Sequence, residues 1–262
     1  MRTLVVGADG FIGRHLMPLL GEAVPFEGDI SDLGAFQQVV QDVQPEVIIN
    51  LAGVLRGNLA EMSTVHVGGA EVISSVVGTC RILSAGTAAE YGIVPPRPVT
   101  EDFPCAPVSA YGMTKLLATQ ALGEKATIFR PSNVIGPGMS SDLLLGNVIA
   151  QLKSGATSIE VSGLHTIRDY IDVRDVASAI VALMAAPPGI YNVSSGVGTS
   201  TEALLEMLRQ ASGLNYEVKV GAQGSQSSDL DVFIADSTKL QSLGWQPRYS
   251  LEESVRATWE AA

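Results

Sequence analysis

Short apolar runs alternate with helical hydrophobic periodicity along most of the chain. Runs rich in β-branched and other apolar residues predict strands at residues 4–6, 24–26, 47–49, 81–83, 127–129 and 190–193. Apolar residues spaced three or four positions apart predict helices at 11–20, 36–43, 61–77, 109–124, 172–186 and 201–211. Such strand–helix–strand alternation is typical of a parallel sheet covered by helices. The pattern therefore predicts a doubly wound α/β fold.

The regular pattern is weaker in two parts of the chain. Residues 131–168 are rich in Gly, Ser and Leu and show no clear period, and residues 221–228 have the composition of a polar loop. We predict two units between which the chain crosses more than once. The larger unit comprises residues 1–132 and 169–193, and a small C-terminal lobe comprises residues 133–168 and 194–262.

Three glycines in the order GxxGxxG directly follow the first predicted strand. Gly7, Gly10 and Gly13 allow a tight turn, a close approach of the backbone to a pyrophosphate, and close packing of a helix on a strand. Phe11 and Ile12 lie at the start of the predicted helix, whose N-terminal N–H groups and positive dipole end favour an anion. The position of this motif between strand and helix predicts a phosphate loop for a dinucleotide.

The end of the second predicted strand bears on which dinucleotide is bound. Glu27 stands where a carboxylate can bind ribose hydroxyls, an arrangement that favours NAD. It can equally be a solvated turn residue, and no Lys or Arg stands near it in the sequence to hold the 2′-phosphate of NADP. The sequence leans towards NAD and leaves the choice between NAD and NADP open.

A tyrosine, a lysine and a threonine form a candidate catalytic set. Tyr111 and Lys115 lie four positions apart on a predicted helix, so both side chains share one face. A phenol has a pKa of about 10, which a neighbouring ammonium is expected to lower, so that the phenol can exchange a proton with a carbonyl or carbinol oxygen. Thr87 follows the strand predicted at 81–83. The carboxyl ends of parallel strands are where open α/β folds bind ligands, which places Thr87 at the predicted site.

The charge balance narrows the range of partners. The 262 residues include 16 Lys and Arg and 27 Asp and Glu, which gives a net charge of −11. Proteins that bind polyanions or anionic membranes need an excess of basic residues, so we expect neither nucleic acid nor a membrane as a partner. The chain has two cysteines without a CxxC motif, and we see neither a signal peptide nor a membrane span. These features predict a cytoplasmic protein.

Several other chemistries are disfavoured by missing motifs. The chain contains neither the GxSxG motif of α/β-hydrolases nor the GxxxxGK[ST] motif of P-loop NTPases. His15, His66 and His165 are too far apart for an HExxH motif, so no metal site is expected.

Taken with these motifs, further sequence patterns make the chain resemble an extended short-chain dehydrogenase/reductase of the NAD-dependent epimerase/dehydratase type, a group that acts largely on nucleotide sugars. The resemblance spans nearly the whole length. Its additional motifs are Gly28-Asp29-Ile30, Asn50-Leu51-Ala52-Gly53, Tyr91-Gly92, Pro98-Val99-Thr100-Glu101-Asp102, Arg130-Pro131-Ser132-Asn133-Val134-Ile135-Gly136-Pro137-Gly138, Arg168-Asp169-Tyr170-Ile171-Asp172-Val173-Arg174-Asp175-Val176, Tyr191-Asn192-Val193 and Leu243-Gly244-Trp245-Gln246-Pro247.

The resemblance implies an architecture and a set of catalytic roles. The larger unit would be a dinucleotide-binding Rossmann-type domain, and the C-terminal lobe would bind the substrate. Thr87 would hydrogen-bond the reacting oxygen, Tyr111 would transfer the proton, and Lys115 would tune Tyr111 and hold a cofactor ribose. The helices predicted at 61–77 and 109–124 correspond to the usual dimer surface of this family, so a homodimer is implied.

The resemblance also implies residues that bind the two ligands. For the cofactor, besides the glycine motif, Tyr111 and Lys115, these are Asp29 and Ile30 at the adenine and Leu51, Ala52 and Gly53 at the inner ribose and phosphates. For the diphosphate of a nucleotide sugar they are Asn133 and Arg168. The planar fork of a guanidinium suits a phosphate. A salt bridge from Arg168 to Asp169 or Asp172 remains the structural alternative.

The residues that follow Thr87 narrow the reaction. Dehydratases of this family resemble a Thr-Asp-Glu or Thr-Ser-Glu pattern, whereas Ala88 and Ala89 can transfer no proton. Reductases that also epimerise neighbouring carbons place a cysteine where Ala88 stands. Glu90 is interpreted as a structural residue beside Tyr91. The remaining Thr–Tyr–Lys set suffices for hydride transfer at one carbon, which disfavours a dehydratase.

Three hypotheses remain. The leading one is the NAD(P)H-dependent reduction of the 4-keto group of a nucleoside-diphosphate 4-keto-6-deoxyhexose, a reaction of deoxysugar biosynthesis, with Tyr111 as the proton donor. The first alternative is an NAD-dependent nucleotide-sugar 4-epimerase, which oxidises C4 and reduces it again from the other face. The second alternative is a non-catalytic NAD(P)-binding regulator, which the intact Tyr–Lys pair disfavours.

Overall fold

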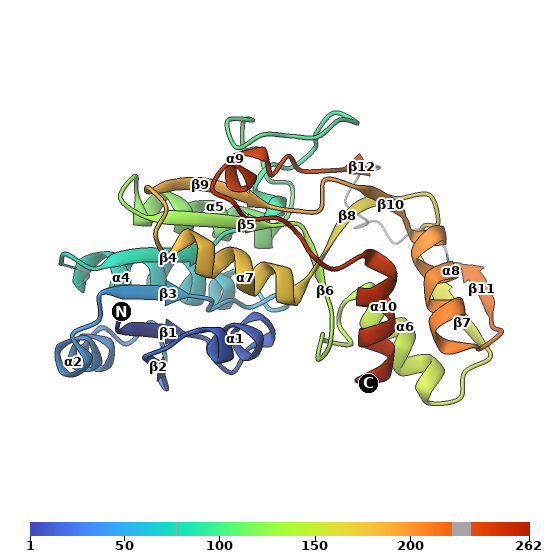
Figure 1. Ribbon diagram of the computed structural model, residues 1–262, viewed down its shortest axis with the longest axis horizontal. Coiled ribbons are helices and arrows are strands. Elements are labelled where there is room, and N and C mark those ends of the chain that lie inside the picture. Colours follow the sequence, from blue (N-terminus) through green and yellow to red (C-terminus); the bar gives the residue numbers. More distant parts are fainter. Residues whose placement is uncertain (77, 222–231) are drawn as a thin grey trace.

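Six parallel strands form the central sheet of the protein (Figure 1). The computed structural model describes residues 1–76, 78–221 and 232–262. The sheet has the order β2-β1-β3-β4-β5-β9, and every neighbouring pair of strands is parallel. Its strands are β1 (Thr3–Val6), β2 (Ala23–Phe26), β3 (Val47–Asn50), β4 (Arg81–Ala85), β5 (Thr127–Pro131) and β9 (Gly189–Val193). The predicted doubly wound α/β fold is confirmed.

Helices cover both faces of this sheet, and each face has its own apolar core. On one face, α1 (Phe11–Leu16) and α7 (Val173–Leu183) pack against the strands. On the other face lie α2 (Leu33–Val43), α4 (Gly69–Val76) and α5 (Ala110–Leu122). Because the sheet is covered on both sides, every residue of β1 and β3 is buried.

The strand order reverses between β1 and β3. From β1 the chain passes to β2 at the edge of the sheet and then returns to β3 on the other side of β1. In open α/β sheets, ligands bind outside the carboxyl ends of the strands at such a point. Gly7 follows β1 in a left-handed conformation (φ +76°), and a Cβ on it would lie 3.1 Å from the backbone nitrogen of Ala52, which follows β3. Two of the predicted cofactor-binding segments therefore meet here.

A second group of elements forms the lobe at the right of Figure 1. There β8 (Ile167–Asp172) pairs with β6 (Asn133–Ile135), β10 (Gly198–Ser200) and β12 (Val232–Phe233), while β7 (Ser158–Val161) pairs with β11 (Glu217–Val220). The helices α6 (Leu144–Lys153), α8 (Thr201–Ser212) and α10 (Leu251–Glu260) bury a third apolar core against these strands.

The prediction of an irregular stretch at residues 131–168 was wrong, because this stretch contains β6, α6, β7 and the start of β8. Polar or charged residues interrupt the apolar runs of these strands, and no side chain caps α6 at Leu143, so the usual local signals are weak. The sequence interpretation also missed α9 (Thr238–Gln241) and α10, although Ser250 and Glu253 form a capping box that marks the start of α10.

Two predicted helices differ from those observed. The helix predicted at 11–20 ends at Leu16, and a 3₁₀ turn η1 (Met17–Leu19) containing a proline follows. The helix predicted at 61–77 is divided into α3 (Leu59–Ser63), a π-helical turn η2 (Thr64–Gly68) and α4. Residue 77, and residues 222–228 of the predicted polar loop, lie outside the described residues.

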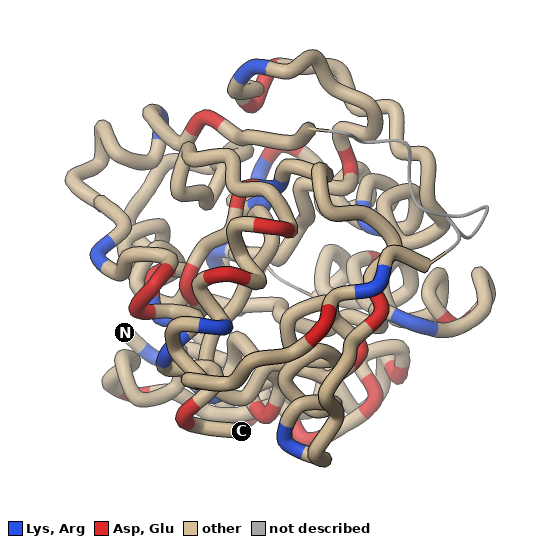
Figure 2. The backbone as a smooth tube through the Cα atoms, turned by 90° about the vertical axis from the view of Figure 1, so that its right-hand side faces the viewer, with Lys and Arg blue, Asp and Glu red and all other residues tan. Residues whose placement is uncertain are grey.

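Charged residues are distributed along the whole fold. Figure 2 shows Asp and Glu interspersed with Lys and Arg on many elements rather than gathered in one segment. Within the ranges that the structure describes, no helix combines the length and the apolar character needed to cross a membrane.

The contact between α1 and the phosphate loop can be tested by adding a methyl group. A Cβ on Gly13 would lie 2.3 Å from the carbonyl oxygen of Gly7 and 2.5 Å from that of Ala8. We expect Gly13→Ala to lower the free energy of unfolding by about 1–3 kcal/mol, because backbone atoms must move apart. Equilibrium denaturation measures this change. In the control Gly21→Ala the new Cβ meets nothing within 4 Å. Equal unfolding free energies for the two variants would contradict the close packing of α1.

Candidate active site

Helix α5 carries two of the three predicted catalytic side chains. Ser109 caps α5, its Oγ accepting a hydrogen bond from the Gly112 backbone at 3.1 Å, and this cap fixes where the helix begins. Tyr111 and Lys115 then lie one turn apart on the same face of the helix. Lys115 reaches the end of β4, where its Nζ donates to the carbonyl of Ala85 at 3.0 Å.

Two glycines allow the turn at residues 87–90, here called the Thr87 turn, to lie close to α5 and β4. A Cβ on Gly112 would lie 2.5 Å from the carbonyl oxygen of Ala89, and a Cβ on Gly86 would lie 2.5 Å from Oε1 of Glu90. Any larger residue at Gly112 would force α5 away from the Thr87 turn. The absence of these side chains therefore brings Tyr111 within hydrogen-bonding reach of the Thr87 side chain.

The Thr87 turn is held by its own capping box. Thr87 is the N-cap of the 3₁₀ turn η3 (Ala88–Glu90), and its Oγ1 accepts a hydrogen bond from the Ala89 backbone at 3.2 Å. In return, Oε1 of Glu90 accepts from the Thr87 backbone at 2.9 Å. These reciprocal bonds fix the backbone of Thr87 beside Tyr111.

A buried ion pair lies beneath the Thr87 turn. The Glu90 side chain is 0% exposed, and its Oε2 accepts from Nε (2.9 Å) and NH2 (2.8 Å) of Arg130, which is 2% exposed, and from Oγ1 of Thr119 (3.2 Å). The Arg130 guanidinium also lies over the ring of Tyr91, 4.6 Å from its centroid. Because both carboxylate oxygens of Glu90 are engaged, it serves as the structural residue that the sequence predicted. Arg130 itself was not predicted for this role; an arginine ending the apolar run 127–129 was the available signal.

The site shifts the pKa of Tyr111 in the direction opposite to the one predicted. Burial raises the pKa of Tyr111 to about 12, although the hydrogen bond with Thr87 lowers it, and the charge of Glu90 adds to the increase. The predicted effect of Lys115 is absent from these causes. Its ammonium is instead bonded to the carbonyls of Ala85 and Ala52, at 3.0 and 3.2 Å. Burial outweighs the hydrogen bond with Thr87, so the phenol is harder to ionise than that of a free tyrosine.

Burial changes the pKa of Lys115 in the opposite direction. Its side chain is 5% exposed, and this desolvation lowers the pKa of Lys115 to about 8, against the opposing effect of the Glu90 charge. Its ammonium therefore remains mostly charged at neutral pH. A Cβ on Gly53 would lie 3.2 Å from Nζ of Lys115, so the loop after β3 lies close to this lysine.

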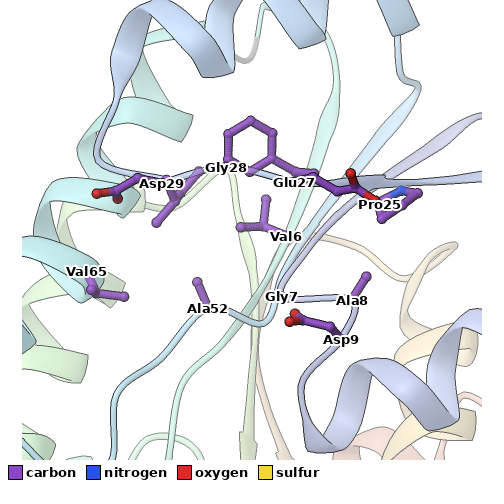
Figure 3. Close-up of a pocket in the computed structure, with 12 residues that line it drawn as sticks. Val6, Gly7, Ala8, Asp9, Pro25, Glu27, Gly28, Asp29, Ala52 and Val65 are labelled. Carbon is purple, nitrogen blue, oxygen red and sulfur yellow. The ribbon is translucent and has the colours of Figure 1, made fainter.

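A cavity of about 510 Å³ lies at the reversal of the strand order (Figure 3). Its lining residues are Val6, Gly7, Ala8, Asp9, Pro25, Phe26, Glu27, Gly28, Asp29, Ile30, Ala52 and Val65. Asp29, from the loop after β2, and Asp9, from the phosphate loop, lie on opposite sides of the pocket in Figure 3. The backbone and hydroxyl of Ser31 both donate to Oδ1 of Asp29, and these bonds lower the pKa of Asp29.

This cavity suits a dinucleotide. It brings together four of the predicted cofactor residues, Gly7, Asp29, Ile30 and Ala52. No described side chain caps α1 at Gly10, so the helix start with Phe11, Ile12 and Gly13 offers backbone N–H groups to an anion. Of the other predicted residues, Leu51 is the neighbour of Ala52 and touches Gly7, while Gly53 lies against Lys115. The contacts implied for each residue stay predictions.

The two predicted substrate residues lie on neighbouring strands of the second lobe. Asn133 on β6 pairs in register with Tyr170 on β8, two positions from Arg168. The Asn133 amide donates to the carbonyl of Asp169 at 3.1 Å, and NH1 of Arg168 donates to the carbonyl of Ile167 at 3.0 Å. The structure thus places the two residues near one another, and their role towards a diphosphate stays a prediction.

Comparison with known proteins adds independent information. Residues 3–194 match the model of the NAD-dependent epimerase/dehydratase family. The chain is 29% identical to the dTDP-6-deoxy-L-talose 4-dehydrogenase (NAD(P)⁺) of Kitasatospora kifunensis, over 99% of this chain and 95% of that protein. It is 30% identical to the UDP-glucose 4-epimerase of Mycolicibacterium smegmatis, over 99% and 98% of the two chains. The solved structure of RMD from Pseudomonas aeruginosa with NADPH has the same fold, with a TM-score of 0.89, 23% identity, and coverage of 100% and 98%.

The buried ion pair beneath the Thr87 turn makes a testable contribution to stability. Arg130→Met leaves the Glu90 carboxylate buried without its counter-charge, which costs about 3–5 kcal/mol of unfolding free energy. The double variant Glu90→Gln/Arg130→Met removes both charges and is expected to be more stable than Arg130→Met alone. Equilibrium denaturation of both variants measures these changes. If Arg130→Met lowered the free energy of unfolding by less than about 1 kcal/mol, this buried pair would contribute no more than an exposed salt bridge does.

Proposed function

The chain belongs to the NAD-dependent epimerase/dehydratase family, and on this premise we propose that it reduces the 4-keto group of a nucleoside-diphosphate 4-keto-6-deoxyhexose with NAD(P)H. The observation that carries this proposal is the composition of the Thr87 turn. Thr87, Tyr111 and Lys115 are all present, whereas Ala88 and Ala89 fill the positions where a dehydratase needs a further acid and base. The site is equipped for hydride transfer at one carbon.

The relatives support the same chemistry. By its name, the talose 4-dehydrogenase oxidises a dTDP-6-deoxysugar at C4 with NAD(P)⁺, and the reverse of that reaction is the reduction of a 4-keto group. Glu90 lies close enough to be considered as an additional acid or base. It is wholly buried, and both of its oxygens accept hydrogen bonds from Thr87, Thr119 and Arg130, which supports assigning it no part in proton transfer.

Tyr111 carries at neutral pH the proton that a donor must supply. With its pKa raised to about 12, the phenol holds its proton at neutral pH and can deliver it to the oxygen of the substrate's keto group. The Thr87 hydroxyl offers that oxygen a second hydrogen bond, and the Lys115 ammonium adds a positive charge nearby. When bound, the reduced nicotinamide cofactor supplies the hydride for the same carbon.

The cofactor and the substrate are assigned to different parts of the fold. The dinucleotide is held by the phosphate loop, by the cavity at Asp29 and Ile30, by the segment 51–53 and by Lys115. We assign the larger unit, residues 1–132 and 169–193, to the cofactor, and the lobe formed by residues 133–168 and 194–262 to the sugar nucleotide. There Asn133 and Arg168 meet the diphosphate.

We also propose a cytoplasmic homodimer. Met113 and Leu117 lie one turn apart on α5, and they are 43% and 42% exposed, so this helix offers apolar side chains away from the site. The α5 helix belongs to the surface that the family uses for pairing, and burial of these side chains against a second copy would remove them from water.

A 4-epimerase is the second candidate, because a relative at 30% identity is a UDP-glucose 4-epimerase. The same Thr–Tyr–Lys set can oxidise C4 and reduce it again. The two activities differ in their use of the cofactor, which an epimerase retains and regenerates and a reductase consumes. The complete catalytic set also speaks against a non-catalytic regulator.

The proposed reduction is tested by the absorbance of NAD(P)H with a panel of nucleoside-diphosphate 4-keto-6-deoxyhexoses. We expect one cofactor molecule to be oxidised for each sugar reduced. Tyr111→Phe is expected to abolish turnover while cofactor binding persists, because only the proton-donating hydroxyl is lost. Epimerisation without net oxidation, with cofactor retained on the purified protein, would favour the second candidate. Substantial turnover by Tyr111→Phe would remove Tyr111 from the role of donor.

The acidic wall of the cavity predicts a preference for NADH over NADPH. The lining residues include Asp9, Glu27 and Asp29 but neither Lys nor Arg, so the 2′-phosphate of NADPH would meet only like charges. We expect kcat/KM to be about tenfold or more higher with NADH. Glu27→Lys should lower the ratio of kcat/KM with NADH to kcat/KM with NADPH. Glu22→Lys, at a residue outside the lining, should leave this ratio unchanged. A wild-type preference for NADPH would contradict this assignment.

A further inference from the structure

A buried histidine that the proposed chemistry does not use lies beside the catalytic side chains. His66 is 2% exposed and belongs to the π-helical turn η2, between α3 and α4. Single π-turns within α-helices are uncommon and occur frequently at functional sites. The sequence interpretation considered His66 only as a potential metal ligand.

The hydrogen bonds of His66 determine which ring nitrogen carries the proton. Nε2 lies 3.0 Å from the backbone nitrogen of Val54, which can only donate, so Nε2 must accept. The neutral ring then carries its proton on Nδ1, which lies 2.8 Å from Oγ1 of Thr114. The Thr114 hydroxyl in turn lies 3.0 and 3.1 Å from the carbonyls of Ala110 and Tyr111. Burial and the charge of Lys115 lower the pKa of His66 to about 4, which keeps the ring neutral.

The imidazole packs against Tyr111 and lies on the same side of Gly53 as Lys115. Its ring meets the Tyr111 ring edge-on, with centroids 5.6 Å apart and an interplanar angle of 79°. A Cβ on Gly53 would lie 3.2 Å from Nζ of Lys115 and 3.6 Å from Nε2 of His66, so both nitrogens face the same backbone position. His66 thus packs between α5 and the segment 53–58 that follows β3.

The far part of this segment reaches the second lobe. Arg56 NH2 donates to the carbonyl of Asp142 at 2.7 Å, and its NH1 lies 3.4 Å from the Asp142 carboxylate. The segment ends at Asn58, which caps α3 in a capping box with Glu61. Between the strand end and this cap, Lys115 of α5 bonds the carbonyl of Ala52, and the bond from Val54 to His66 ties segment 53–58 to α5 through Thr114.

We propose that neutral His66 is a positioning residue, which holds segment 53–58 against α5 and thereby keeps Tyr111 and Lys115 in place beside Thr87. This inference rests on the proposed function, in which these three residues act on the substrate. His66 itself donates no proton to substrate, since both of its nitrogens are bonded within the protein.

Two substitutions separate the hydrogen bonds of His66 from its bulk. His66→Phe keeps an aromatic ring of similar size and loses both bonds, whereas His66→Gln offers a carbonyl oxygen to Val54 and an amide donor to Thr114. We expect His66→Phe to lower kcat about tenfold to a hundredfold, because misplacement of catalytic groups by about 1 Å has effects of this size. We expect a smaller change in the substrate KM and substantial recovery of kcat in His66→Gln.

A second readout does not depend on turnover. Hydrogen exchange of segment 53–58 should become faster in His66→Phe and return towards the wild-type rate in His66→Gln. Thr258→Val is the matched control, because it removes a buried hydroxyl, bonded at 2.6 Å to the Ser254 carbonyl in α10, away from this segment. It should change neither kcat nor the exchange of segment 53–58.

The outcomes distinguish the two proposals. A His66→Phe variant with wild-type kcat, or with unchanged exchange in segment 53–58, would overturn the positioning role. Equal loss of kcat in His66→Phe and His66→Gln would also overturn it, because hydrogen bonding would then not be the cause. A wild-type protein that reduces no member of the sugar panel would overturn the proposed function, while the exchange rates would still decide whether His66 holds the segment.

Discussion

The close contact between α5 and the Thr87 turn is the constraint on which the candidate active site depends. It exists because position 112 has no side chain, so the helix can approach the carbonyl of Ala89. The same approach places the phenol of Tyr111 beside Thr87 and sends Lys115 to the ends of β3 and β4. Beneath the turn, the charge of Glu90 is balanced by a guanidinium, which makes this dense packing compatible with a buried carboxylate.

Burial then sets the protonation of the side chains in the site. Removal from water disfavours charge, so it raises the pKa of Tyr111 and lowers those of Lys115 and His66. At neutral pH the site therefore holds a protonated phenol, a neutral imidazole and a mostly charged ammonium. This combination suits the donation of a proton to a developing oxyanion. The protein's net charge of −11 cannot attract anionic ligands, so backbone N–H groups and a few cations must hold them.

The sequence predicted the features that depend on local patterns of apolar residues and glycines. Buried β-branched runs located the parallel strands, and the glycines of the predicted phosphate loop lie after β1 at the reversal of strand order. A small C-terminal lobe was predicted, but several of its elements were missed, because polar residues interrupt the apolar runs of β6, β7 and β8 and no side chain caps α6. Effects of packing between elements could not be predicted from local sequence patterns either. The partnership of Arg130 with Glu90, the upward shift of the Tyr111 pKa and the anchoring of segment 53–58 by His66 all depend on packing between separate elements.

The raised pKa of Tyr111 is tested most directly by a spectroscopic pH titration. The tyrosinate absorbance of the wild-type protein is compared with that of Tyr111→Phe, so that the difference reports the ionisation of Tyr111 alone. A donor held in this buried site should ionise with a pKa of about 12. Ionisation at or below the value of about 10 that is usual for a free tyrosine would contradict the claim that packing beside the Thr87 turn raises the pKa of this phenol.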